Sequence, residues 1–204
     1  MKVYITSSIK KYFNTYIEFV DYYWINFFKK YKINYEILPC DKDNILKKFK
    51  TKKNLKSILI LTGGSDVVGS KYDTRIRNLA ESFLIKKSLK NRIPILGICR
   101  GAQLFCKLKG FKIKKCKNNM RTTHKVFFKR KFLKYKQTEM VNSYHDYCIK
   151  LMNKKKFEFL ALDKKKRVEF FIFNKINYFI MWHPERNKNY SELKMLIDSL
   201  SRNI

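Results

Sequence analysis

The sequence predicts a single α/β domain over residues 1–204, with a mostly parallel central sheet flanked by helices and further strands added at the sheet edge. Short, almost wholly apolar runs alternate with longer amphipathic stretches in the first half, as in strands that helices cover on both faces. With 204 residues and 45% hydrophobic content, the chain can bury one substantial core. No internal repeat or low-complexity linker divides the sequence.

The first half of the chain supplies the parallel strands and their helices. Each expected strand is a short apolar run, and each expected helix carries apolar residues at helical spacing. We expect strands at residues 2–6, 33–39, 57–61 and 93–98, and helices at about 17–31 and 74–90. The aromatic side chains of the first helix, from Phe19 to Phe28, are expected in the core. Because strands and helices alternate, neighbouring strands should be parallel.

The second half of the chain is richer in strands. HKVFF, EMVNSYH, RVEFFIF and YFIMW combine β-branched and aromatic residues in short runs, which is typical of strands. They predict the strands that extend the sheet at its edge. The lysine-rich stretch 107–117 is expected to be exposed.

The formal charge of +31 raises the question of a nucleic-acid partner, because basic surfaces bind phosphate. Only 9 of the 47 basic residues are arginine, and Lys, Asn, Ile, Phe and Tyr are abundant, which is the composition that an AT-rich genome encodes. The lysines are scattered, without an RNA-recognition, KH or zinc-finger pattern. We therefore expect no nucleic-acid partner, although the charge favours an anionic small substrate.

Nothing in the sequence predicts a membrane segment. No apolar run approaches the roughly 18 residues that span a bilayer. The opening MKVYITSSIKKYF also lacks the long apolar region of a signal peptide. We expect a cytoplasmic protein with no membrane partner, and the sequence leaves open whether it forms a homodimer.

The cysteines do not predict a disulfide framework or a zinc ribbon. They are odd in number and widely spaced, with no CxxC pair. The five are Cys40, Cys99, Cys106, Cys116 and Cys148. We expect most of them to be reduced thiols.

The segment PILGICRGAQLF, residues 94–105, places a cysteine in a candidate nucleophile turn. A buried strand that ends at GICRG and continues into a helix can project Cys99 above the carboxyl edge of the sheet. Gly97 and Gly101 remove side chains where the strand and helix backbones nearly touch. The helix N-terminus favours a thiolate at Cys99. A buried thiol is the alternative, and it is the better interpretation of Cys106.

The base of such a nucleophile must come from three histidines. His183 lies in IMWHPERN, where the following proline favours extended geometry and places His183 and Glu185 on the same side. This predicts a triad in which Cys99 attacks, His183 transfers the proton and Glu185 orients the imidazole. A His-Pro-Glu segment alone is an ordinary turn, so the specific signal is its pairing with the cysteine turn. The spacing of the histidines leaves a three-histidine metal site open as an alternative, but we expect no metal or organic cofactor.

These motifs carry a family resemblance. GICRGAQ with a downstream WHPE resembles the class I glutamine amidotransferases, whose fold is flavodoxin-like. Arg100 after the cysteine, together with VNSYH, is similar to the γ-glutamyl hydrolase branch, peptidase family C26. LTGGSD, RIRNLAE and HKVFF complete the order of segments shown by that branch, and the resemblance covers most of the chain.

The resemblance implies a site for a γ-glutamyl group. The backbone N–H groups of Gly64 and Arg100 would hold the oxyanion of the tetrahedral intermediate. The glutamyl amino and carboxylate groups would bind around further residues of the cleft, with a histidine on the leaving-group side. These are Gln103, Asn142, Ser143 and His145. From the residues alone, a surface glutamine, an ordinary turn and a structural histidine are the alternatives, and His124 is better interpreted as structural.

The implied activity is hydrolysis of a γ-glutamyl amide through a thioester on Cys99, with release of glutamate. A glutaminase subunit that passes ammonia to a synthetase is an alternative, which Arg100 disfavours, and an intact triad argues against an inactive regulatory protein. Aminobutyrate-type γ-glutamyl amines and γ-glutamyl peptides remain alternative substrates. We expect a phosphate-bearing, nucleotide-linked leaving group, because the chain is basic and Arg121 and Lys125 flank His124. Two departures from the branch, Asn78 in RIRNLAE and the absence of a glutamine after VNSYH, affect this choice of substrate.

Overall fold

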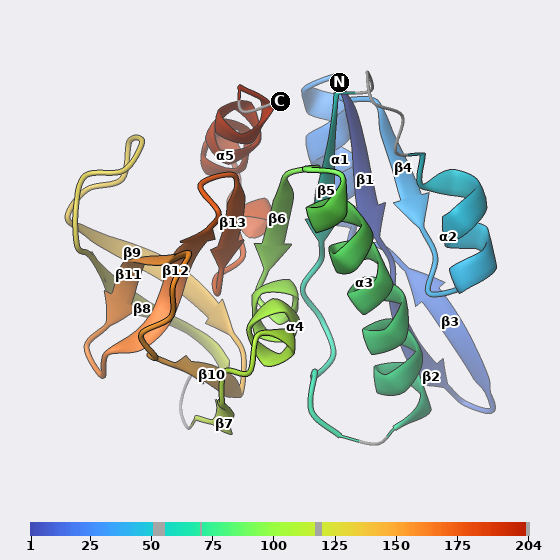
Figure 1. Ribbon diagram of the computed structural model, residues 1–204, viewed down its shortest axis with the longest axis horizontal. Helices are drawn as coiled ribbons and strands as arrows, with labels where there is room; N and C mark the ends of the chain where they lie inside the picture. The colour runs from blue at the N-terminus through green and yellow to red at the C-terminus, as the bar shows by residue number, and fades with distance from the viewer. Residues whose placement is uncertain (51–55, 70, 117–119, 203–204) are drawn as a thin grey trace.

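A mixed β-sheet forms the centre of the computed structural model, which describes residues 1–50, 56–69, 71–116 and 120–202 (Figure 1). In spatial order its main strands are β4 (Tyr35–Leu38), β1 (Lys2–Thr6), β5 (Ser57–Leu61), β6 (Ile95–Ile98), β13 (Asn177–Ile180), β12 (Arg167–Phe173), β11 (Phe157–Asp163), β8 (Met120–Phe128) and β9 (Thr138–Tyr144). Two short strands, β10 (Tyr147–Lys150) and β7 (Ile113–Lys115), branch from β12.

Helices cover both faces of the parallel part of this sheet. They are α1 (Tyr22–Lys30), α2 (Lys42–Lys48), α3 (Tyr72–Lys90), α4 (Arg100–Leu108) and α5 (Ser191–Ser201). The apolar side chains of α1 and α5 pack on one face, and those of α2, α3 and α4 pack on the other. In Figure 1, α3 and α4 lie in front of the sheet. Among the described helices, none is long and apolar enough to cross a membrane.

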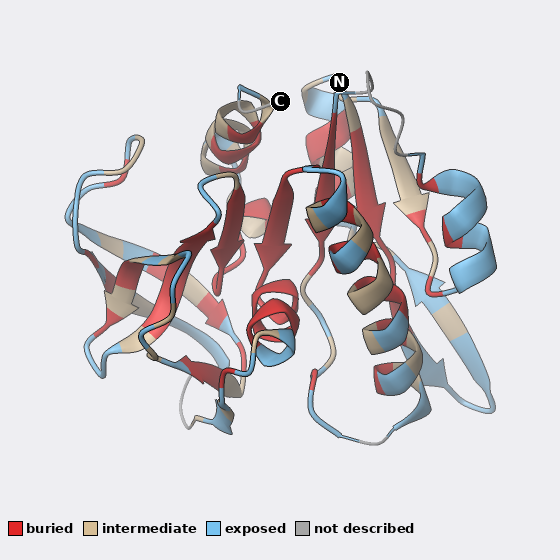
Figure 2. Ribbon diagram, in the orientation of Figure 1, coloured by how far each residue is buried: buried red, intermediate tan, exposed pale blue. Residues whose placement is uncertain are grey.

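The run β4–β1–β5–β6–β13 is parallel throughout, which confirms the predicted central sheet. Every residue of β5 and β6 is buried, because helices cover these strands on both sides (Figure 2). From β13 onward, β12, β11, β8 and β9 pair antiparallel and confirm the added edge strands. The carboxyl ends of β5, β6 and β13 meet at one edge, where candidate catalytic residues follow each strand.

The predicted helix at 17–31 is wrong in its first part. Residues Ser8–Tyr12 and Thr15–Phe19 form an antiparallel hairpin, β2 and β3, whose two-residue turn holds Phe13 at a φ of 50°. The helix begins at Tyr22, after Asp21 caps it by accepting a hydrogen bond from the Tyr23 amide. The expected aromatic core is correct only for Trp24, Phe27 and Phe28, because Phe19, Tyr22 and Tyr23 are exposed.

Several elements have no counterpart in the sequence prediction. They are α2, α5 and the strands β7, β10 and β11. The other predicted strands and the long helix α3 are present, within a few residues of their predicted ends. The lysine-rich stretch 107–117 is largely exposed as expected, except that Phe111 is buried, and residue 117 lies outside the described part.

One pair of cysteines departs from the expected thiols. Cys116 and Cys148 form a disulfide, whereas Cys40, Cys99 and Cys106 are free and buried. The two bonded residues are 32 positions apart in sequence, and the antiparallel ladder of β7 and β10 brings them together. Cysteine spacing carries no information on such a ladder, so this pair could not be found from the sequence.

The helix that follows Cys99 approaches β5 closely at Gly101. A Cβ on Gly101 would lie 2.7 Å from the Leu61 carbonyl oxygen, so the helix start fits the strand only without a side chain. We expect Gly101→Ala to lower the free energy of unfolding by about 1–3 kcal/mol, although alanine is the better helix former. Urea unfolding measures the change. Ser82→Ala on α3 is the matched control, and a Gly101→Ala protein as stable as this control would contradict the close approach.

Candidate active site

Cys99 occupies a strained turn between β6 and α4. Its φ of 47° and ψ of −97° lie outside the regions that residues with a side chain favour, and its side chain is buried. Its amide donates to the Ile180 carbonyl at 2.7 Å, and its carbonyl accepts from the Gln103 amide at 3.0 Å. A Cβ on Gly97 would lie 2.4 Å from the Phe179 ring. This is the predicted strand–turn–helix that presents a nucleophile at a helix N-terminus.

His183 and Glu185 follow β13 at the same edge of the sheet. The short 3₁₀ helix η1 (Pro184–Arg186) turns the chain so that His183 Nδ1 and Glu185 Oε1 lie 2.6 Å apart, with both side chains buried. Because Nδ1 is bound to the carboxylate, Nε2 is the nitrogen available to Cys99. Gly63 makes room for the imidazole, since a Cβ there would lie 2.5 Å from His183 Cε1.

The electrostatics of this pair keep the imidazole protonated. Burial alone lowers the pKa of His183, but the charges of Glu185 and Cys99 and the hydrogen bond with Glu185 outweigh it and raise the pKa to about 10. The folded chain therefore holds this proton more tightly than the unfolded chain, whose histidine has a pKa of 6.5. The resulting stabilisation is complete below pH 6.5 and is lost as the pH rises through about 10.

Asn142, predicted to bind substrate, holds the backbone of His183. Its Nδ2 donates to the His183 carbonyl at 2.9 Å, and its Oδ1 accepts from the His183 amide at 2.8 Å. Both ends of the amide are thereby engaged, and β9 is tied to the segment after β13. The structure places Asn142 where it positions the base.

The side chain of Arg100 points into the protein and leaves only its backbone amide near Cys99. Its guanidinium binds Glu81 and donates to Asn78 Oδ1 at 2.7 Å. Burial and the nearby Arg77 lower the pKa of Arg100 to about 10, and Glu81 acts in the opposite direction. Asn78 also donates to the Val67 carbonyl, so the asparagine that departs from the family pattern connects Arg100 to the loop between β5 and α3.

Arg77 anchors the LTGG turn and was not assigned from the sequence. It donates to the carbonyls of Thr62 and Gly63 and to Ser8 Oγ, at 2.9 to 3.0 Å, and pairs with Glu81 at 3.0 Å. The Gly64 φ of +123° completes this turn. Arg77 and Glu81 both lie in RIRNLAE, four positions apart on α3. This spacing on a predicted helix is the sequence signal that could have indicated an ion pair between them.

A pocket of about 410 Å³ adjoins Cys99. It is lined in part by Gly64, Gln103 and His145, three of the predicted site residues. Asp66 and Asp146 also line it, and the pKa of Asp66 is raised by burial and by the charge of Asp146. A larger cavity of about 680 Å³, between β9 and α5, does not include Cys99.

The other predicted binding residues are buried around this pocket. Gln103 Nε2 donates to the Tyr147 carbonyl at 3.0 Å, and Ser143 Oγ has no hydrogen-bond partner among the described residues. Burial, followed by the charge of His124, lowers the pKa of His145 to about 4, so this imidazole is neutral at pH 7. His124 faces Glu169 at 3.3 Å, which fits the structural role expected for it.

The fold and these residues define an α/β protein with a cysteine, a histidine and a glutamate at the carboxyl edge of its sheet. The chain belongs to the family described as glutamine amidotransferase class-I, which matches residues 17–202. This confirms the resemblance drawn from GICRGAQ and WHPE.

Individual relatives point to the same family. Over 150 residues the chain is 35% identical to the γ-glutamyl-CDP-amidate hydrolase of Campylobacter jejuni, a match that covers 71% of this chain and 70% of the relative. Over 78 residues it is 38% identical to a putative glutamine amidotransferase-like protein of Lactococcus lactis. That match covers 33% of this chain and 32% of the relative.

Solved structures share the fold at low identity. A putative GMP synthase subunit from Thermoplasma acidophilum superposes with a TM-score of 0.72 and 18% identity, covering 99% of this chain and 92% of that one. A glutamine amidotransferase of Thermotoga maritima superposes with a TM-score of 0.67 and 17% identity. The match covers 99% of this chain and 84% of that one.

The protonation states of His183 and His145 can be tested by NMR titration, because the chain has only three histidines and their signals can be assigned. We expect the imidazole of His183 to be protonated and that of His145 to be neutral at pH 7. Glu185→Gln should lower the pKa of His183 by at least about one unit, because it removes a buried negative charge. Glu158→Gln, at an exposed ion pair with Arg130, is the control and should leave it unchanged. An unchanged His183 titration in Glu185→Gln would rule out this electrostatic role.

Proposed function

We propose that the protein is a stand-alone, cysteine-dependent hydrolase that cleaves a γ-glutamyl amide and releases glutamate. One observation carries the proposal: a strained Cys99 at a helix N-terminus lies beside His183, whose pKa Glu185 and Cys99 raise to about 10. Such a pair supplies a thiolate nucleophile and a protonated imidazole together. The family membership and the hydrolase named among the relatives support it.

In the first half-reaction, the Cys99 thiolate attacks the γ-carbonyl carbon. The backbone N–H groups of Gly64 and Arg100 stabilise the oxyanion. The imidazolium of His183 then donates its proton to the leaving nitrogen, the C–N bond breaks, and a glutamyl thioester forms on Cys99. Glu185 stabilises the imidazolium and holds its Nδ1 in one orientation.

In the second half-reaction, neutral His183 takes a proton from water. The water oxygen attacks the thioester carbonyl, the C–S bond breaks, and glutamate leaves with Cys99 returned to the thiolate and His183 to the imidazolium. We assign the α-ammonium of the glutamyl group to Asp66 and Asp146, because these carboxylates face the same pocket as Cys99. Gln103 lines the same pocket, Ser143 is buried one residue before the pocket residue Tyr144, and Asn142 acts through His183.

For the substrate we propose γ-glutamyl-CDP-amidate, in capsule phosphoramidate synthesis. The chain is 35% identical over 150 residues to a γ-glutamyl-CDP-amidate hydrolase, and the charge of +31 suits a nucleotide-linked leaving group. Arg121 and Lys125, on β8, are exposed on the two sides of His124. γ-Glutamyl amines, γ-glutamyl peptides and glutamine for a synthetase partner are the competing substrates.

The nucleophile is tested by substitution. Cys99→Ser should lower glutamate release by about 10⁴-fold or more, because a serine hydroxyl is not ionised by this histidine. Cys106→Ser, a buried thiol on the same helix, is the control and should retain activity. In the parent protein, iodoacetamide should label Cys99 faster than any other thiol. A Cys99→Ser protein with near-normal rates would refute the mechanism.

The leaving group is tested by a substrate panel at several salt concentrations, with glutamate release as the readout. We expect γ-glutamyl-CDP-amidate to be preferred at least tenfold over glutamine and γ-glutamyl-aminobutyrate. This preference should weaken with salt, because salt screens the attraction between the basic surface and phosphate. Arg121→Gln with Lys125→Gln should reduce the preference, and Lys11→Gln with Lys47→Gln, at exposed positions elsewhere, should not. Equal turnover of all three substrates would contradict the nucleotide-linked leaving group and leave only the proposal of a general γ-glutamyl hydrolase.

A further inference from the structure

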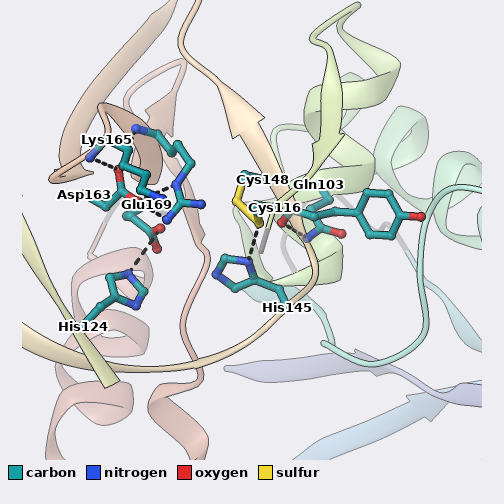
Figure 3. Close-up of a disulfide and its surroundings, with 10 residues drawn as sticks. Gln103, Cys116, His124, His145, Cys148, Asp163, Lys165 and Glu169 are labelled. Atoms are coloured by element: carbon teal, nitrogen blue, oxygen red, sulfur yellow. Dashed lines mark hydrogen bonds and ion pairs between the residues drawn. A yellow bond between two sulfur atoms is a disulfide. The ribbon is translucent and has the colours of Figure 1, made fainter. Parts of the chain in front are cut away.

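Two cysteines and a histidine converge beside the pocket of Cys99. Cys116 follows β7, His145 lies between β9 and β10, and Cys148 is on β10. Their ligand-capable atoms all lie within 4.8 Å of one another. Figure 3 shows the imidazole of His145 pointing at the sulfurs of the two cysteines.

The ladder between β7 and β10 fixes this arrangement. Tyr147 pairs with Lys115 and Cys148 with Lys114, and the Cys116 amide donates to the Asp146 carbonyl at 2.7 Å. Cys116 and Cys148 are therefore two positions apart across the ladder, on one face of it. His145 lies in the connection between β9 and β10, directly before Asp146, and its Nδ1 lies 4.0 Å from Cys116 Sγ.

The disulfide alone does not account for His145. Its Nδ1 lies 4.0 Å from Cys116 Sγ, and its Nε2 has no hydrogen-bond partner in the described part of the chain. The side chain is only 4% exposed. The backbone of Tyr147 also interacts with the imidazole, and the unpartnered Nε2 is a buried polar atom that is costly unless it has a partner in another state of the protein.

Two thiolates and one neutral imidazole are a donor set that zinc prefers. Zn–S bonds of about 2.3 Å and Zn–N bonds of about 2.0–2.1 Å place tetrahedral donors roughly 3.5–3.8 Å apart. The 4.0 Å between His145 Nδ1 and Cys116 Sγ is close to that spacing. The Cα atoms of the cysteines are 5.9 Å apart, so side-chain rotation can separate the sulfurs once they are reduced.

We propose that, when the disulfide is reduced, Cys116, Cys148 and His145 bind one zinc ion. A thiol or phosphine reductant supplies two electrons and the disulfide becomes two thiols. Zinc then displaces the two thiol protons, and His145 donates its nitrogen lone pair. A water molecule takes the fourth position, because the described residues place no fourth side-chain ligand in this cluster.

Zinc at this position fixes one wall of the candidate active site. His145 lines the pocket that Cys99 adjoins. The Tyr147 carbonyl, between two of the ligands, accepts the hydrogen bond from Gln103 on the nucleophile helix. The bound metal and the disulfide are alternative crosslinks of the same segment, and they exclude each other.

Cobalt(II) is the probe, because tetrahedral thiolate coordination to Co²⁺ gives absorption bands that hexaaqua Co²⁺ lacks. The protein is reduced with a phosphine, which makes every variant free of the disulfide, and is titrated with Co²⁺ and then Zn²⁺. We expect one Co²⁺ per chain, with thiolate charge-transfer absorption that Zn²⁺ abolishes. The oxidised protein should show no such band, because its two sulfurs are bonded to each other.

Variants identify the ligands and separate this cluster from the catalytic cysteine. Cys116→Ser and Cys148→Ser should each abolish the charge-transfer band of the parent, and His145→Ala should weaken binding at least tenfold. Cys106→Ser and Cys99→Ser should keep the band, with circular dichroism to confirm folding. In the parent protein, zinc should protect Cys116 and Cys148 from iodoacetamide, a readout that needs no variant.

Three results would overturn the proposal. They are a reduced parent that binds no Co²⁺, binding that Cys99→Ser abolishes, and zinc that leaves Cys116 and Cys148 fully reactive. Because every readout is metal binding or thiol labelling, none depends on the substrate or on the proposed hydrolysis.

Discussion

The candidate site depends on the buried ion pairs that the carboxylate of Glu81 forms with two arginines. It binds Arg77 on one side and Arg100 on the other, and all three side chains are almost wholly inaccessible to solvent. Arg77 holds the carbonyls of the LTGG turn, and Arg100 is the first residue of the nucleophile helix, so one carboxylate connects both predicted oxyanion donors. Removing it would leave two buried cations without their counter-ion, a change that costs about 3–5 kcal/mol in comparable cases. This network therefore sets the position of the turn and of the helix start together.

The strain at Cys99 persists because its surroundings leave the turn no alternative. The amide of Cys99 is bound to the carbonyl of Ile180 on the neighbouring strand, and the helix is held against β5 at Gly101. On the other side of the cleft, Asn142 binds the backbone of His183 at both its amide and its carbonyl. Cys99 and His183 thus follow different strands, but each is fixed through its backbone, which leaves the two side chains available for the proposed chemistry.

Much of this arrangement is predictable from local sequence, and the rest depends on contacts that local sequence does not encode. Apolar runs predict the central strands, GICRG indicates Cys99, and HPE indicates His183 and Glu185, because each of these signals is contained within a few consecutive residues. The predicted helix starts at residue 17, inside β3, because alternating and helical aromatic spacing overlap there. The hydrogen bonds between Asn142 and the His183 backbone join β9 to the segment after β13, and the Cys116–Cys148 bond follows from the register of β7 and β10; only the folded sheet defines either contact. Likewise, the role of Glu81 requires its two arginines to meet in space.

The three histidines show how the surroundings, more than the residue type, assign a role. Burial works against the charged form of both His183 and His145. Next to His183 a carboxylate and the cysteine reverse that effect, so the imidazole stays protonated and can donate a proton to a leaving group. His145 has no carboxylate partner in the described cluster and lies near the charge of His124, so it stays neutral, the form in which imidazole binds a metal. Two buried imidazoles around one cleft therefore take opposite protonation states. The position of Glu185, two residues from His183, accounts for this difference.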